Sequence, residues 1–82
     1  MKVEQLITDE ALEVAWGNAD FGPNTNKRDV IRYTLLKTAC GYASGHTADC
    51  IVNELGLKHS FGKLTELGKR YLYEAFRDGS NL

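Results

Sequence analysis

Four side chains between residues 40 and 59 are of the types that bind metal ions or take part in catalysis, namely Cys40, His46, Cys50 and His59. Zinc sites commonly draw two ligands from one turn, as in C-x2-C and H-x3-H pairs. Here the order is Cys-x5-His-x3-Cys-x8-His, which contains neither pair. We therefore predict that the cysteines are free thiols, that the histidines lie on the surface, and that no metal or other cofactor is bound.

The two histidines could also act as general acids or bases, which requires a partner group within hydrogen-bond reach. Neither has a nucleophile or a pair of carboxylates at a recognisable spacing beside it. The segment GKLTELGKR, residues 62–70, combines glycines with lysine as a phosphate-binding loop does. However, five residues separate its glycines, and neither Ser nor Thr follows its lysine. We therefore predict that the protein is not an enzyme.

The composition is that of an ordinary folded domain, because 43% of the 82 residues are hydrophobic and 26% are charged. This length predicts a single domain over residues 1–82. No apolar run approaches the roughly 18 residues that a membrane span needs, and the start of the chain lacks the features of a signal peptide. We therefore expect a cytoplasmic protein without a membrane partner, in which Cys40 and Cys50 stay reduced and form no disulfide.

Charge is distributed unevenly along the chain, although the net charge is only −1. Residues 1–20 carry one lysine and five acidic residues, a net charge of −4, whereas residues 21–40 carry four basic residues and one acidic residue, a net charge of +3. Nucleic-acid-binding domains are usually strongly basic. The net charge of −1 argues against DNA as a partner. However, the basic residues in the middle of the chain could form a local patch, so DNA binding stays an alternative.

The helices that position the candidate site residues can be located from the residues that cap their ends. Thr8 stands before Asp9 and Glu10, so a first helix is expected to begin there and to end at Gly17. A second, central helix is expected to begin after Asn26. Its inward-facing residues are expected to be Ile31, Leu35, Leu36, Ala39 and Cys40.

A third helix is expected between Thr47, as its N-cap, and Gly56, as its stop. Leu57 should then fold back as the hydrophobic contact of the C-terminal cap. The residues expected to face the core are Ala48, Ile51, Val52 and Leu55. The opposite face is expected to display His46, Asp49, Cys50 and Asn53.

The segment GLKHSFGKLTELGKRYL, residues 56–72, predicts a minimal β-hairpin around residues 58–63, with Gly62 at its turn. Thr65 is expected to cap a fourth helix, in which Gly68 would allow a close approach to another backbone. The inner stripe of this helix is predicted to be Leu67, Tyr71, Leu72, Ala75 and Phe76. Its outer residues are Lys69, Arg70, Tyr73 and Arg77, which we interpret as a solvated face in preference to the alternative, a binding stripe. The predicted core therefore includes Leu35, Ile51, Leu55, Leu72 and Phe76.

The order of ELGL at 54–57, a short hairpin, LTELG at 64–68 and then KRYL resembles the wing region of winged-helix proteins. The resemblance covers residues 46–76. It implies a mainly α fold, a compact four-helix winged-helix-like domain with one minimal β-hairpin. The hairpin is too short for a full basic wing, and the recognition face carries Asp49 and no arginine. The whole chain is also similar to small phage or prophage proteins.

Two functions follow from this resemblance and from the charge pattern. In the first, the protein is a DNA-binding regulator whose helix at 46–55 enters the major groove of double-stranded DNA. In the second, the same scaffold binds and modulates a host protein, and a homodimer is compatible with either function. The residues expected at the site are His46, Thr47, Asp49, Asn53, Lys58, His59 and Lys63.

Overall fold

The computed structural model describes residues 2–22 and 25–79 of the chain. Within these ranges the fold is mainly helical, as predicted. The helices are α1 (Val3–Leu6), α2 (Asp9–Trp16), α3 (Lys27–Cys40), α4 (His46–Glu54) and α5 (Glu66–Gly79). The described part of the chain thus has five helices where four were predicted, because α1 was not anticipated.

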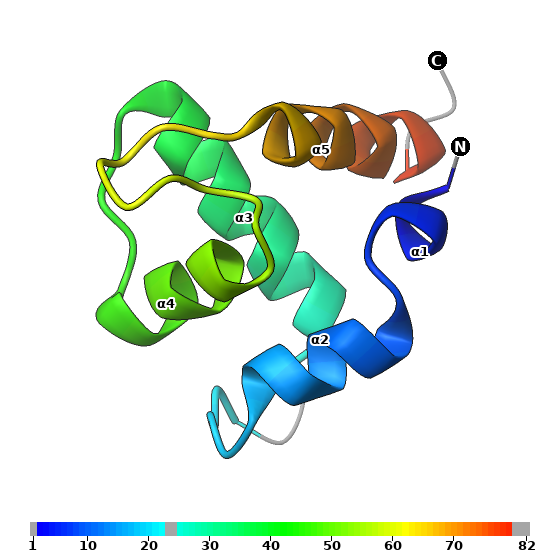
Figure 1. Ribbon diagram of the computed structural model, residues 1–82, viewed down its shortest axis with the longest axis vertical. Coiled ribbons are helices and arrows are strands. Elements are labelled where there is room, and N and C mark those ends of the chain that lie inside the picture. Colours follow the sequence, from blue (N-terminus) through cyan, green and yellow to red (C-terminus); the bar gives the residue numbers. More distant parts are fainter. Residues whose placement is uncertain (1, 23–24, 80–82) are drawn as a thin grey trace.

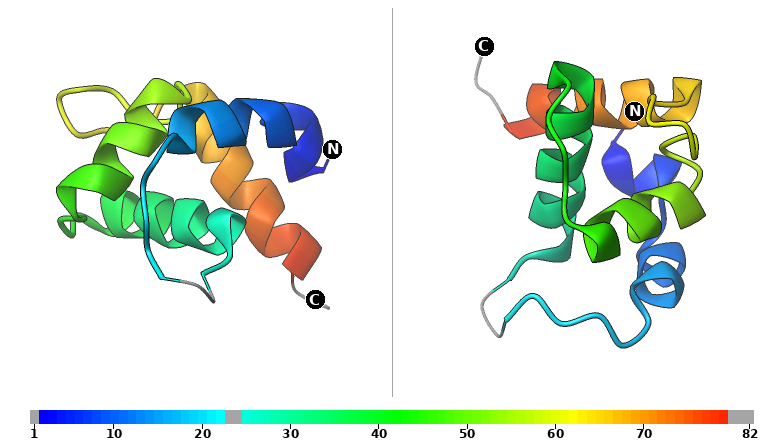
Figure 2. Two further views of the ribbon diagram at one scale, coloured as in Figure 1. Left: turned by 90° about the horizontal axis from the view of Figure 1, so that it is seen from below. Right: turned by 90° about the vertical axis from the view of Figure 1, so that its left-hand side faces the viewer.

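The long helix α3 runs through the middle of the molecule, and the other helices surround it (Figure 1). Helix α5 crosses one end of α3, α4 packs along its side, and α2 packs against α4. Both views in Figure 2 show α1 beside α5, so the start and the end of the described chain lie together. All four longer helices therefore share one interior.

Three of the predicted helix starts are confirmed by their capping hydrogen bonds. The Thr8 hydroxyl accepts from the Ala11 amide at 3.2 Å, and the Asn26 side chain accepts from the amides of the first turn of α3. The Thr65 hydroxyl accepts from the Gly68 amide at 2.9 Å. The start predicted for α4 is wrong, because Gly45 occupies its N-cap position, where no side-chain oxygen can accept a hydrogen bond.

The predicted hairpin at residues 58–63 is not formed as a pair of strands. The described residues contain only an isolated antiparallel β-bridge between Lys58 and Leu64. Gly62 does adopt a positive φ of 98°, and its amide donates to the His59 carbonyl at 3.0 Å. The segment is therefore a tight turn between α4 and α5.

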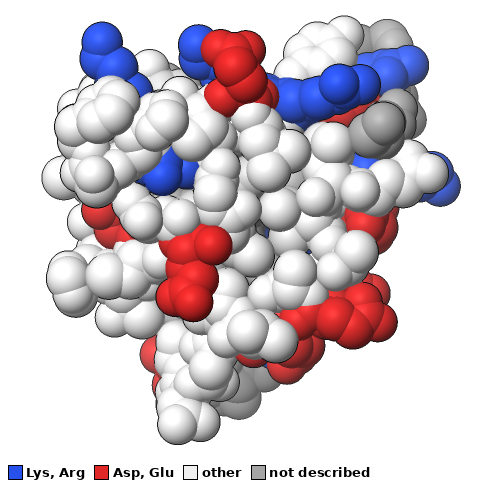
Figure 3. Space-filling model, viewed as in Figure 1, with Lys and Arg blue, Asp and Glu red and all other residues white. Residues whose placement is uncertain are grey.

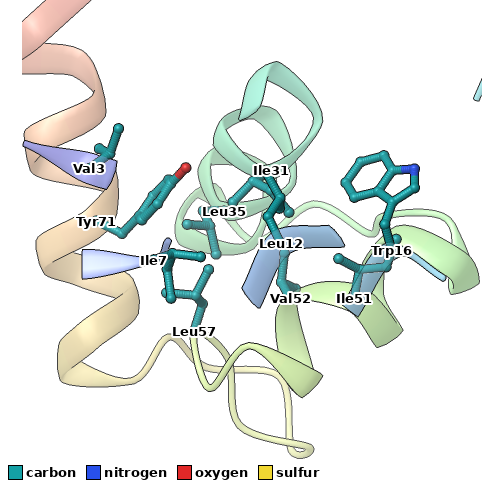
Figure 4. Packing of buried hydrophobic residues seen from close by; sticks show 10 residues of the cluster. All are labelled: Val3, Ile7, Leu12, Trp16, Ile31, Leu35, Ile51, Val52, Leu57 and Tyr71. Atoms are coloured by element: carbon teal, nitrogen blue, oxygen red, sulfur yellow. The ribbon is translucent and has the colours of Figure 1, made fainter. Parts of the chain in front are cut away.

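The core is a single cluster to which every helix contributes (Figure 4). Leu35 and Ile51 are buried as predicted, and the half-buried Leu55 and Leu72 pack against the core, so the expected inner stripes of α4 and α5 are largely confirmed. The predicted place of Phe76 in the core is wrong, because this residue is 41% exposed. The cluster consists of Val3, Ile7, Leu12, Trp16, Ile31, Leu35, Ile51, Val52, Leu57 and Tyr71.

The junction between α4 and α5 is built by a close approach of two backbones. Gly56 has a φ of 76°, and the Leu57 amide then donates to the Val52 carbonyl at 3.0 Å, so Leu57 folds back into the core as predicted. A Cβ at Gly68 would overlap the Leu57 carbonyl oxygen and would lie 2.9 Å from the Leu57 carbonyl carbon. The prediction that this glycine permits a close approach is confirmed.

A buried polar contact joins α3 to α5 and to the connection between α1 and α2. Arg28 donates to the Tyr71 hydroxyl at 3.2 Å, to the Ile7 carbonyl at 3.0 Å and to the Asp9 carboxylate at 2.7 Å. Burial raises the pKa of Tyr71 above its ordinary value, and Arg28, which lowers that pKa, offsets the rise only in part. Burial alone would lower the pKa of Arg28, but its hydrogen bonds to Asp9 and Tyr71 outweigh burial and raise it.

One further prediction about a single side chain is wrong. Cys40 was expected on the inner face of its helix, but it is exposed, because Gly41 ends α3 immediately after it. In the loop after α2, Phe21 is 37% exposed and packs on the edge of the core, with its ring centroid 5.2 Å from that of Trp16.

Candidate functional site

The residues predicted from the sequence to form a site lie on two different surfaces. His46, Thr47 and Asn53 are exposed on α4, as expected. His59 and Lys63 are exposed on the turn that follows. Asp49 and Lys58 lie between these surfaces and are partly buried, because they form an ion pair with each other.

This ion pair changes the role expected for Lys58. Its side chain is only 12% exposed and its ammonium group contacts the Asp49 carboxylate, so its charge is already compensated within the fold. Lys58 is therefore a poor candidate for contacting a phosphate. The nine residues of α4 include neither lysine nor arginine, and its second carboxylate is that of Glu54. With Asp49 and Lys58 neutralising each other, this face has no net positive charge with which to attract a polyanion.

On the same helix, His46 and Cys50 form a pair that the sequence analysis missed. The Cys50 Sγ lies 3.5 Å from the His46 Nε2, because residues four apart stand above one another on a helix. The separation of three residues, the same as in an H-x3-H pair, was the signal in the sequence, but here a cysteine stands in place of the second histidine. Within residues 2–22 and 25–79 no group of three or more metal-binding side chains is found, so the pair supplies only half of a tetrahedral site.

The tip of the turn carries an exposed aromatic pair. The His59 ring stacks on the Phe61 ring, with centroids 4.7 Å apart and planes 9° from parallel, and Phe61 is 72% exposed. The His59 amide donates to the Lys63 carbonyl at 2.7 Å, which closes the turn and directs the chain back toward α5. The turn thereby places Lys63 beside the end of α3.

A groove lies between α3, the turn and α5, and we call it the α3–α5 groove. Its volume is about 1110 Å³. One wall is the C-terminal end of α3, the other is the outer face of α5, and Leu64 lies between them. The residues that line it are Leu36, Thr38, Ala39, Gly41, Gly62, Lys63, Leu64, Lys69, Leu72, Tyr73, Phe76 and Arg77.

The groove combines an apolar lining with positive charge. Tyr73 is 66% exposed and Phe76 is 41% exposed, although both are large aromatic residues. Every charged residue that lines the groove is basic: Lys63, Lys69 and Arg77. In the view of Figure 3, most basic side chains lie along the upper edge, with one acidic group among them, and the other acidic side chains in view lie lower.

Sequence reasoning recorded part of this surface but interpreted it as a solvated face. Lys69, Leu72, Tyr73, Phe76 and Arg77 are spaced i, i+3, i+4, i+7 and i+8, which is the pattern of one helix face. Because Leu72 and Phe76 were assigned to the core, the apolar character of the outer face was not apparent. The groove also needs the C-terminal end of α3, which is distant from α5 in the sequence.

Comparison with protein-family models, with curated proteins and with solved structures returned no match to this chain. In addition, no described helix is long and apolar enough to cross a membrane. Statements about function therefore depend on the geometry and charge of the described residues.

Proposed function

We propose that this chain is a protein-binding module that docks a partner protein in the α3–α5 groove. The observation that carries the proposal is the groove itself, in which Leu36, Leu64, Leu72, Tyr73 and Phe76 present apolar surface around one hollow. Contiguous exposed apolar patches are uncommon on monomeric proteins and often mark interaction sites. Tyrosine is also among the residues that contribute most to binding energy at protein interfaces.

The charge on α4 makes the DNA-binding alternative less favourable. A winged-helix-type reader would insert α4 into the major groove, where phosphates flank it on both sides. The Glu54 carboxylate would then approach those phosphates, while Lys58 and Asp49 already neutralise each other. The candidate residues of α4 thus supply hydrogen-bonding groups without the positive charge on which nucleic-acid affinity depends.

The proposal is tested by capturing partners with the full-length chain from a lysate of the source organism, after nuclease treatment. Tyr73→Ala should weaken capture of a specific protein by about 30-fold, because a buried aromatic anchor contributes roughly 2 kcal/mol or more. Tyr42→Ala is the matched control, since Tyr42 is 72% exposed and does not line the groove. It should leave capture unchanged.

The DNA alternative is tested on the same proteins by fluorescence anisotropy with random-sequence duplex DNA at low salt. There the electrostatic contribution to nucleic-acid binding is strongest. Duplex binding that Asn53→Ala weakens and Tyr73→Ala leaves intact would overturn the proposal in favour of α4 as a DNA reader. Equal capture by the wild-type chain and by Tyr73→Ala would remove the groove as the docking site.

A further inference from the structure

We infer that the partner segment that occupies the α3–α5 groove is an acidic amphipathic helix. The inference rests on the proposed function, since it specifies what docks in the groove. It depends on three features of the described residues: the shape of the two walls, the sign of the lining charges, and the lack of a matching segment on this chain's own surface.

The walls favour a helix over an extended strand or a small molecule. Both walls are helices, and apolar groups line each of them, Leu36 and Ala39 on α3 and Leu72 and Phe76 on α5. A partner helix with anchors at i, i+3, i+4 and i+7 has an apolar stripe wide enough to contact both walls at once. Strand addition requires a free strand edge, and the described residues contain only one isolated β-bridge.

The volume is consistent with a helix as the occupant. At about 1110 Å³ the groove exceeds the range of roughly 300 to 1,000 Å³ that is typical of small-molecule sites. Tyr73 and Phe76 remain substantially exposed beside it, so a ligand confined to the groove would leave apolar surface uncovered. A helix laid along the groove would cover both rings.

The lining charges select an acidic partner. Lys63 makes no ion pair within the described residues. Lys69 and Arg77 pair only with neighbours three residues away on α5, at 3.3 and 3.4 Å, and their side chains are more than half exposed. The Lys69–Glu66 pair is exposed on both sides and contributes little energy, so Lys69 can still pair with a carboxylate of a partner. Arg77 is paired with Glu74, whose side chain is only 7% exposed, so its charge is already compensated in part. Carboxylates flanking the apolar stripe of a docked helix would therefore complement Lys63 and Lys69 first.

A second copy of this chain is a poorer occupant. Its acidic helix α2 carries Asp9, Glu10 and Glu13, which match the groove in charge. However, Leu12 and Trp16 of α2 are buried in its own core, and Val14 is the exposed large apolar residue that α2 offers. One valine cannot fill a groove lined by five large apolar residues, so the helix must come from another protein.

The test uses a panel of fluorescently labelled synthetic peptides and the full-length chain, with binding followed by anisotropy. The panel contains acidic amphipathic helices in several registers, scrambled peptides of the same composition, and the same helices with lysine in place of glutamate. We expect the acidic amphipathic peptides to bind and the scrambled and lysine peptides to bind at least about tenfold more weakly. Equal binding of acidic and scrambled peptides, or absence of binding by every acidic peptide, would overturn the inference.

Charge reversal locates the peptide on the protein. Lys63→Glu should weaken binding of the acidic helix roughly tenfold and strengthen binding of the lysine peptide. Arg70→Glu is the matched control, because Arg70 is an exposed cation on α5 that does not line the groove. Thermal unfolding followed by circular dichroism verifies that both variants fold. Equal effects of the two reversals would contradict docking in the groove.

Failure of the inference can be told apart from failure of the proposed function. If a partner captured from the lysate depends on Tyr73 but the acidic peptides do not compete with it, the groove binds a protein and the inference about the helix is wrong. A dimer in sedimentation equilibrium that Tyr73→Ala dissociates would identify a second copy as the occupant and would also overturn the inference.

Discussion

Arg28 is the residue that joins the most distant parts of the chain. Its guanidinium group binds the carbonyl at the end of α1, the first carboxylate of α2 and the phenol of α5, while its backbone belongs to the first turn of α3. A planar group with five N–H donors suits such a position, because it can satisfy several acceptors at fixed angles. Arg28 thereby provides a hydrogen-bond partner for the hydroxyl of Tyr71, which is buried in the core.

The stability of the protein should therefore fall in alkaline solution because of Tyr71. Its folded-state pKa is raised by burial above the unfolded value of about 10, so the protonated phenol favours the folded state. This contribution is complete below about pH 10 and is lost as the pH rises through the folded-state pKa. Melting temperatures measured across this range should decline for the wild-type protein and decline less for Tyr71→Phe.

The matched control is Tyr73→Phe, since Tyr73 is 66% exposed and its phenol meets similar solvent in both states. The alkaline decline should be the same in Tyr73→Phe as in the wild-type protein. If Tyr71→Phe has the wild-type pH profile instead, the decline arises from other groups.

At the scale of elements, the connection from α4 to α5 orients the groove. Leu57 is buried and its carbonyl accepts from the Thr65 amide at 3.1 Å, while the Thr65 hydroxyl donates to the Gly56 carbonyl at 2.6 Å. These contacts hold the start of α5 against the end of α4. The turn between them then brings Lys63 to the same side of the molecule as the outer face of α5.

Gly68→Ala should reveal how tightly this connection is packed. Alanine is the better helix former by about 1 kcal/mol. Here, however, its Cβ would overlap the backbone of Leu57, which cannot move aside as a flexible side chain can. We expect the free energy of unfolding, measured by urea denaturation, to fall by about 2 to 3 kcal/mol.

Gly45→Ser provides the comparison, because Gly45 has a negative φ and no atom within 4 Å of its Cβ position. At the N-cap of α4, serine should be neutral or stabilising by a few tenths of a kcal/mol. An increase in stability for Gly68→Ala would mean that α5 does not approach Leu57 closely.

At the scale of the whole molecule, one core supports two surfaces of opposite character. The acidic face belongs to α4, and the basic, apolar groove lies between α3 and α5. All five described helices contribute side chains to one core cluster. No helix therefore buries its apolar residues independently of the others. The surfaces should therefore form and be lost together when the protein folds and unfolds.

A substitution at one edge of the core should accordingly destabilise the entire domain. Ile7 is 6% exposed, so Ile7→Ala should lower the free energy of unfolding by about 2 to 5 kcal/mol. Circular dichroism and the fluorescence of Trp16, the only tryptophan, should report the same shifted transition. Val14→Ala, at a position that is 79% exposed, should change stability little. Separate transitions for the two signals would show that the core is divided.

The sequence by itself determined the features that depend on neighbouring residues. Thr8, Asn26 and Thr65 were recognised as helix caps, and Gly17 and Gly56 as helix ends, because a cap satisfies backbone groups within one turn of itself. The mainly helical class followed from these signals and from apolar spacing. The four-residue helix α1 could not be recognised in this way, since a single turn is not stable alone and depends on its packing against α5.

Only the tertiary structure decided which face of each helix is buried and where a site can form. On α5, the sequence predicted both Tyr71 and Leu72 to face the core, but it did not show that Tyr71 would be fully buried and bonded to Arg28 while Leu72 lines the groove. The pairing of Asp49 with Lys58 likewise requires the bend at Gly56. The groove forms only where the end of α3 meets the turn and α5 in the folded chain, because apolar spacing marks a stripe on a helix but not the neighbour beside it.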